Sequence, residues 1–155
     1  MKEIQLTQGK VALVDDEDYD WLNQWKWFAH KEGNNWYVRR KYKGKMLRMH
    51  RVILGLTQEN DIEVDHINRI GSDNRRDNLR ICNHSQNMKN YSKKKETSSQ
   101  YKGVTWVKNR KKWQVSIKAN GKNIWLGYFL FEELAALAYD FAALKYHREF
   151  AHFNY

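Results

Sequence analysis

A stretch of eight residues without a single apolar side chain interrupts the sequence at 92–99, where it runs Ser-Lys-Lys-Lys-Glu-Thr-Ser-Ser. Segments rich in serine and lysine cannot join a packed core and commonly form flexible linkers. We therefore predict one domain over residues 1–91, a linker at 92–99 and a second domain over residues 100–155. Each domain must bury a core of its own, and the 155-residue chain has seven Trp, nine Tyr and six Phe with which to do so.

The composition excludes several classes of protein. The apolar runs are too short to cross a membrane, and the first residues lack the apolar stretch of a secretory signal. The single cysteine, Cys82, excludes an internal disulfide framework and any zinc site that uses two thiolates of this chain. We expect a soluble, intracellular protein in which Cys82 is a small buried apolar residue.

The charge of the chain is strongly positive and unevenly distributed. Lys and Arg number 28 against 18 Asp and Glu, which gives a formal net charge of +10. Residues 1–22 carry six acids and two lysines, whereas residues 89–112 carry nine bases and one acid, Glu96. A block of one sign this long is typical of a polyanion-binding surface, although a solvated tail can have the same composition. We expect a nucleic acid as partner, and nothing in the sequence implies a membrane or a protein partner.

The apolar pattern predicts a first domain of short elements. Strands are expected at 3–7 and 11–14 and a hairpin at 27–30 and 36–42. One short helix is expected to begin at a cap within 15–20 and to carry Leu22 and Trp25, and another is expected at 49–56. Two more short strands are expected at 62–65 and 78–81. Asn83 and Gln86 then form a pattern typical of a capping box, which predicts a third helix directly after the last of these strands.

Four polar side chains of this last segment suit the hydrolysis of a phosphodiester. That reaction needs a base for the attacking water, a cation on the phosphate and stabilisation of the leaving oxygen. His66 is a candidate base because a neutral imidazole accepts a proton near pH 7. Asp65 and Asn87 offer a carboxylate and an amide oxygen, which suit Mg²⁺. Asn78 can hydrogen-bond the backbone of the loop between the strands and so hold the imidazole in one orientation.

The same segment resembles the HNH homing-endonuclease superfamily, whose strand–loop–strand–helix unit is called ββα-metal. The similarity covers Asp65-His66, Asp77-Asn78-Leu79-Arg80, Ser85-Gln86-Asn87 and, upstream, His50-Arg51-Val52-Ile53. The resemblance implies that His66 is the general base and that Asn78 orients the loop. It also implies that Asp65 and Asn87 bind Mg²⁺ or another divalent cation. Asn87 stands where the namesake motif has histidine, as in a subgroup encoded by phages and introns, and for His50 a structural role and a phosphate contact both stay open.

The second domain has a cleaner pattern. Three strand-like runs, at 104–107, 113–118 and 123–129, precede an amphipathic helix over 132–146. Asn120 and Gly121 between the last two runs are a strong hairpin signal. One helical stripe holds Leu134, Leu137, Ala138 and Phe141, and the alanines of the helix would let it lie close to a sheet. We expect an α+β protein: a β-rich N-terminal region with the ββα-metal unit, then a three-stranded antiparallel sheet packed on one helix.

Residues 101–155 resemble the DNA-binding domain of the plant ethylene-response factors, also called Apetala-two, which is found beside HNH nucleases in phages. The matching motifs are Tyr101-Lys102-Gly103-Val104, Trp113, Ile117-Lys118, Trp125-Leu126-Gly127-Tyr128-Phe129 and Ala135-Ala136-Leu137-Ala138-Tyr139-Asp140. In that family the sheet enters the major groove of DNA. The expected DNA-binding side chains are Lys102, Lys108, Arg110, Lys112, Lys118 and Trp125. Thr105 and Val107 replace arginines that are usual in the plant domains, so phosphate contacts are expected in place of base-specific readout.

These features together predict a metal-dependent DNA endonuclease of the homing type, working on double-stranded DNA in the cytoplasm of a bacterial or phage-infected cell. The first domain cuts, by a nick or a double-strand break, and the second positions it. A non-catalytic DNA-binding transcriptional regulator and an RNA-binding structural protein are the alternatives, since both would use the same basic surface without a metal. Relaxation of supercoiled plasmid in Mg²⁺ distinguishes the first interpretation from the other two.

Overall fold

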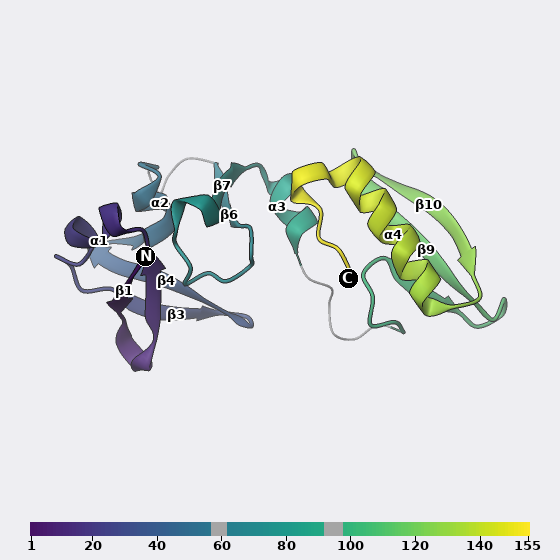
Figure 1. Cartoon of the computed structure of the whole chain (residues 1–155), viewed down its shortest axis with the longest axis horizontal. Coiled ribbons are helices and arrows are strands. Elements are labelled where there is room, and N and C mark those ends of the chain that lie inside the picture. The colour runs from purple at the N-terminus through teal and green to yellow at the C-terminus, as the bar shows by residue number, and fades with distance from the viewer. Residues whose placement is uncertain (57–61, 92–97) are drawn as a thin grey trace. The chain divides into compact units, whose positions relative to one another are not determined.

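The computed structural model describes residues 1–56, 62–91 and 98–155 (Figure 1). Contacts divide the chain into two compact units, Met1–Asn87 and Met88–Tyr155. Residues 92–97 of the predicted linker lie outside the described residues. Each unit contains its own hydrophobic core.

The N-terminal half of the first unit is a series of short strands and helices. In chain order these are β1 (Lys2–Gln5), β2 (Val11–Val14), α1 (Asp16–Leu22), β3 (Phe28–Glu32), β4 (Asn35–Tyr42), β5 (Lys45–Arg48) and α2 (Met49–Ile53). β1 and β2 form an antiparallel ribbon, and β3, β4 and β5 form an antiparallel sheet in that order. The expected strands and helices are present with shifted ends, but β5 was not predicted. Its sequence, Lys-Met-Leu-Arg, places its two apolar residues next to each other and so lacks the alternation of a strand.

The rest of the first unit is a hairpin followed by a helix. β6 (Glu63–His66) pairs antiparallel with β7 (Leu79–Cys82), a short 3₁₀ helix (Arg76–Asn78) precedes β7, and α3 (His84–Asn90) follows it. The predicted capping box is confirmed. The Oδ1 atom of Asn83 accepts the backbone N–H of Gln86, and Oε1 of Gln86 accepts the N–H of Asn83, both at 2.9 Å. These two bonds determine where α3 begins.

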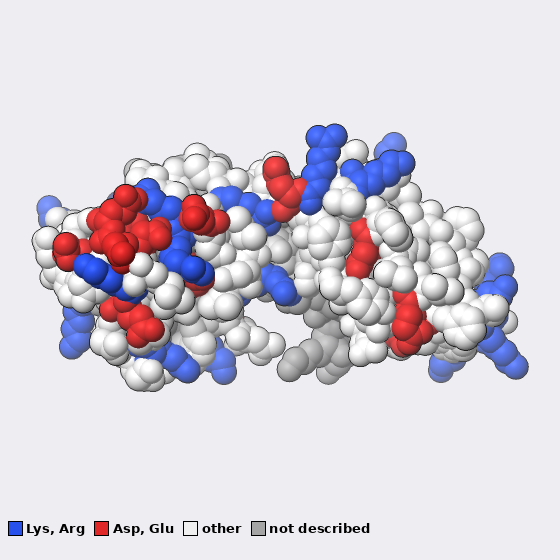
Figure 2. All heavy atoms as spheres, in the orientation of Figure 1, with Lys and Arg blue, Asp and Glu red and all other residues white. Residues whose placement is uncertain are grey.

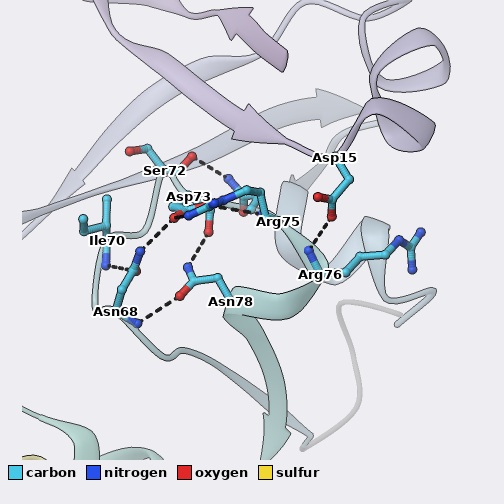
Figure 3. Close-up of polar contacts among 9 residues, drawn as sticks. Asp15, Asn68, Ile70, Ser72, Asp73, Arg75, Arg76 and Asn78 are labelled. Atoms are coloured by element: carbon cyan, nitrogen blue, oxygen red, sulfur yellow. Dashed lines mark hydrogen bonds and ion pairs between the residues drawn. The ribbon is translucent and has the colours of Figure 1, made fainter. Parts of the chain in front are cut away.

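The N-terminal ribbon holds the loop between β6 and β7. The backbone N–H of Leu13 donates to the carbonyl of Ser72 at 2.9 Å, and the N–H of Asn74 donates to the carbonyl of Leu13 at 2.8 Å. The N–H of Arg76 donates to Oδ2 of Asp15 at 2.7 Å (Figure 3). The hydrophobic core of this unit contains residues from both of its halves: Ile4, Ala12, Val14, Leu22, Trp27, Val38, Met49, Ile53 and Leu79. The loop is therefore held by a ribbon that precedes it by about sixty residues in the sequence.

The second unit is a three-stranded antiparallel sheet with one helix. Its elements are β8 (Val104–Val107), β9 (Lys112–Ala119), β10 (Lys122–Phe129), α4 (Glu132–His147) and a short 3₁₀ helix (Arg148–Phe150), and β9 is the central strand. The predicted hairpin is confirmed. Asn120 and Gly121 join β9 to β10 with φ of 51° and 75°, the left-handed pair that a tight two-residue turn of this kind requires.

α4 packs on the sheet through its small side chains. Ala135, Ala136, Ala142 and Ala143 are buried against β8, β9 and β10 together with Tyr139. A Cβ atom at Gly103, where φ is 75°, would lie 2.1 Å from the ring of Tyr139, so only glycine allows this approach. The stripe of leucine and phenylalanine that made the helix amphipathic lies on its solvent side.

The expected α+β class is confirmed, with several small antiparallel sheets and four α-helices in the described ranges. No helix of the described residues is long and apolar enough to span a membrane. Cys82 is buried, as expected, and burial raises the pKa of its thiol to about 11.

Candidate functional site

The hairpin of β6 and β7 places Asp65 and His66, a proposed metal ligand and the candidate base, where the loop begins. Asp65 lies opposite Arg80 and His66 lies opposite Leu79 in the antiparallel register. They are the last two residues of β6, so both side chains stand where the hairpin passes into the loop. Both side chains are buried, with 6% of Asp65 and 5% of His66 exposed.

His66 sits among aromatic and polar groups. Its ring contacts the rings of His50 and Tyr37 edge-on, with centroid separations of 4.9 and 5.9 Å. Its Nε2 atom lies 3.4 Å from Oδ1 of Asn74. Burial lowers the pKa of His66 below its ordinary value, although the hydrogen bond to Asn74 and the charge of Asp65 partly oppose this. The imidazole is therefore neutral near pH 7 and can accept a proton.

His50 contacts His66 from α2 and is itself 3% exposed. Burial, with the neighbouring charges of His66 and Arg48, holds the pKa of His50 well below its usual range. Within the described ranges its Nδ1 atom is buried without a hydrogen-bond partner. The sequence left a structural role and a phosphate contact open for His50. In the structure its ring is buried and packs against the ring of His66.

Asn78 joins the two ends of the loop that follows His66 (Figure 3). Its Oδ1 atom accepts the backbone N–H of Asn68 at 2.9 Å, and its Nδ2 donates to the carbonyl of Asp73 at 2.8 Å. The N–H of Ile67 donates to the carbonyl of Asn78 at 2.9 Å. One amide thus bonds to the backbone at two points of the loop, in the arrangement that the sequence analysis expected of it.

A second layer of bonds closes the same loop. The Nδ2 atom of Asn68 donates to Oδ2 of Asp73 at 2.7 Å, and Arg75 donates to both oxygens of Asp73 at 2.8 and 2.6 Å. The hydrogen bonds from Arg75 lower the pKa of Asp73, which is 2% exposed. Figure 3 shows Asp73 between Asn68 and Arg75. Paired in this way, the buried carboxylate stays ionised and fixes the course of the loop.

Asp65 is paired with Arg80, a residue that the sequence analysis quoted but gave no role. Nε and Nη2 of Arg80 both donate to Oδ2 of Asp65, at 2.8 and 2.5 Å. The partnership follows from the register, which places the two residues directly opposite each other. Two donors on one oxygen fix the orientation of the carboxylate.

Asn87 contacts Glu63, which the sequence analysis missed. Its Nδ2 atom donates to Oε2 of Glu63 at 2.6 Å, and Nδ1 of His84 lies 2.8 Å from Oε1 of the same carboxylate. Burial raises the pKa of Glu63, but the hydrogen bonds from Asn87 and His84 lower it by more, so the pKa lies below its ordinary value. Because its nitrogen faces Glu63, the amide of Asn87 directs its Oδ1 away from that carboxylate.

Asp65 and Asn87 border one face of the hairpin. Glu63 and Asp65 are two residues apart on β6 and so project from the same face, and Asn87 lies against Glu63. One carboxylate and one amide oxygen are hard donors that fit Mg²⁺, which takes few protein ligands and keeps water and phosphate oxygens. Among the described residues no group of three or more His, Cys, Asp or Glu side chains could hold a metal ion.

The predicted DNA-binding residues occupy the second unit, and three of the six lie on one face of its sheet. Val115, Ile117 and Ala119 of β9 are buried, so Lys112 and Lys118, which alternate with them, project from the face opposite α4. Trp125 pairs with Ser116 of β9, shares that open face and is 60% exposed. Lysine and arginine side chains also gather at the right-hand edge of this unit in the view of Figure 2.

The remaining predicted bases differ in their surroundings. Lys108 and Arg110 are exposed in the turn between β8 and β9, and the Arg110 guanidinium lies 4.9 Å from the centroid of the Tyr128 ring. Lys102 precedes β8, and its Nζ atom donates to the carbonyls of Lys89 and Tyr91 at 2.6 and 2.7 Å. Five of the six predicted residues thus lie on the open face or the adjoining turn, whereas the ammonium group of Lys102 is bound to backbone of its own unit.

Matches to known proteins cover both units of the chain. An HNH endonuclease family matches residues 49–89, and an AP2 domain family matches residues 99–149. An uncharacterized HNH endonuclease of Acanthamoeba polyphaga mimivirus is 32% identical over 148 residues, a match that covers 93% of this chain and 74% of the viral protein. No solved structure matches.

Proposed function

This chain belongs to the HNH endonuclease family, and from that premise we propose that it is a metal-dependent endonuclease of the homing type that hydrolyses double-stranded DNA. Both resemblances inferred from the sequence are confirmed, and at the level of the families the chain is a DNA-binding nuclease. The observation that carries the proposal is a buried, neutral His66 next to Asp65 at the end of β6, with Asn87 of α3 hydrogen-bonded to Glu63 of the same strand.

His66 is the general base of the proposed reaction. Its neutral imidazole takes a proton from the water that attacks the phosphorus atom. As the new phosphorus–oxygen bond forms, the bond to the leaving sugar oxygen breaks, and that oxygen takes a proton from solvent. Asn78 acts as a positioning residue, because its bonds to the loop backbone hold the segment that follows the imidazole.

Asp65 and Asn87 are the proposed metal ligands. Their oxygens would hold a divalent cation, which would supply positive charge to the phosphate and to the leaving oxygen. Arg80 orients the Asp65 carboxylate, and Glu63 orients the Asn87 amide, so each proposed ligand has a partner that fixes it.

The open face of the second unit is the proposed anchor on DNA. Lys112 and Lys118 on this face, and Lys108 and Arg110 in the adjoining turn, suit contacts with phosphates, while Trp125 can pack on a sugar or base. The second unit would then make the contacts that hold the nuclease unit on the duplex.

Replacing Lys118 or Lys112 with glutamine in the full chain should weaken DNA binding and lower its salt dependence. For duplex DNA, each phosphate that is no longer neutralised by a lysine reduces the slope of log affinity against log salt by about 0.9. Gel shifts over a range of salt concentrations measure the slope. Lys145→Gln, on the helix that covers the other face of the sheet, removes the same charge and should leave the slope unchanged. Unchanged slopes for both Lys112→Gln and Lys118→Gln would exclude this face as the anchor.

The proposed activity is tested most directly with supercoiled plasmid. The full-length protein should convert it to nicked or linear product in Mg²⁺, and EDTA should abolish the conversion while a gel shift still detects binding, because the anchor needs no metal. A transcriptional regulator or an RNA-binding protein would give no product under any divalent cation. Equal product with EDTA would show that cleavage does not depend on a metal.

A further inference from the structure

The solvent side of α4 carries a continuous apolar stripe. Leu134, Leu137, Phe141 and Leu144 follow one another at spacings of three and four residues, the repeat of one helix face. Leu130 and Phe131 extend the apolar surface just before the helix begins. All six are exposed, from 42% at Leu137 to 73% at Phe141.

This surface is large for one that faces water. Six side chains of this size and exposure present roughly 600 Å² of apolar surface, at the upper end of what a typical monomer leaves uncovered in one patch. No charged residue interrupts the stripe between Leu134 and Leu144 along its centre. In Figure 2, where α4 lies in front of the sheet, the surface over the helix is mostly uncharged.

The core of the second unit does not account for the stripe. The alanine side of α4 already fills the contact with the sheet, and the buried cluster of this unit contains none of the four stripe residues. Alanine at these four positions would preserve that packing and remove the exposed apolar area. An apolar face that its own unit does not use is typical of a site of association.

We propose that this face joins two copies of the chain, with their α4 helices packed antiparallel about a two-fold axis. An uncharged stripe is complementary to itself, as a two-fold interface requires. Two such faces together would bury about 1,200 Å², the lower limit for a stable interface between proteins.

The charges at the two ends of α4 favour the antiparallel direction. Glu132 and Glu133 lie in its first turn, and Lys145 lies in its last. Antiparallel packing brings the acidic end of one helix beside the basic end of the other and also opposes the two helix dipoles. Parallel packing would place like charges together at both ends.

Sedimentation of the full-length chain over a range of concentrations tests the proposal. Wild-type protein should shift from its 18.8 kDa monomer mass toward twice that mass as concentration rises from about 1 to about 100 µM. Leu137→Glu and Phe141→Glu should each weaken the association by at least about a hundredfold, because the two-fold axis buries each new charge twice. Both positions are exposed, so the variants should keep the wild-type circular dichroism spectrum.

The matched control is Met46→Glu. Met46 lies on β5 in the first unit and is exposed to 42%, the same fraction as Leu137. It should leave the dimer intact. A wild-type chain that stays monomeric throughout the range, or equal weakening by Met46→Glu and Leu137→Glu, would overturn the proposal. Monomeric wild-type protein that Leu137→Glu makes less stable would also overturn it, by showing that another part of the same chain covers the face.

Discussion

Replacing His66 with alanine should slow DNA cleavage by about 10²–10⁴-fold, the usual cost of losing a general base. The affinity for DNA should change little, because the proposed anchor lies in the other unit. The imidazole is buried against His50 and Tyr37, so alanine also leaves a small cavity. His66→Gln fills more of that space and should be equally inactive, which separates the loss of the base from the loss of packing.

Single-turnover plasmid cleavage and a gel shift on the same preparations measure the two effects. His30→Ala is the control, since it removes a histidine from β3 of the same unit that has no part in the proposed site. It should cut at the wild-type rate. Wild-type cleavage by folded His66→Gln would rule out His66 as the base.

The second large effect is expected at the proposed metal ligands. Asp65→Asn keeps an oxygen for Arg80 but removes the charge that would attract the cation, and Asn87→Ala removes the amide oxygen altogether. Each should raise the Mg²⁺ concentration for half-maximal cleavage by at least about tenfold, since even residues behind a metal's ligands are worth about 10–100-fold in affinity. DNA binding measured in EDTA should stay near the wild-type value.

Asp77→Asn provides the matched control for that experiment. It removes an acidic charge from the same loop, but its side chain is exposed and takes no part in the proposed site. Its Mg²⁺ activation curve should superimpose on that of the wild type. If the curves of Asp65→Asn and Asn87→Ala also superimpose on it, neither residue holds the cation.

The sequence predicted those features that neighbouring residues determine. The cap formed by Asn83 and Gln86 and the turn at Asn120 and Gly121 depend on side chains and φ angles within a few residues, so their patterns were sufficient. The short strand expected at 62–65 placed Asp65 and His66 at its end, and β6 does end at His66.

The partners of the site residues could not be predicted in the same way. Arg80 meets Asp65 only once the register of the hairpin is set, and Glu63 meets Asn87 only once α3 folds back beside β6. These pairs join residues that are well separated in sequence, and no local pattern encodes them.

The helix of the second unit illustrates the same limit. Its periodicity placed Leu134, Leu137, Ala138 and Phe141 on one stripe, and its alanines predicted a close approach to the sheet, but no local pattern showed that the larger residues of the stripe would stay exposed. Which side meets the sheet depends on how closely the backbone of the helix must approach, as at Gly103 and Tyr139. Small side chains were needed there, and the larger ones were left outside.

The attachment of the β6–β7 loop to Leu13 limits how this nuclease could be transplanted. Residues 49–89 contain the whole recognised motif, yet without the N-terminal ribbon Ser72 and Asn74 would have no backbone partners on Leu13. Met49, Ile53 and Leu79 would also lose most of their core partners, because the other buried residues of their cluster all lie between Ile4 and Val38. The smallest piece that could be grafted onto a different DNA-binding domain and still keep its loop in place therefore begins at β1, far upstream of the residues that carry the chemistry.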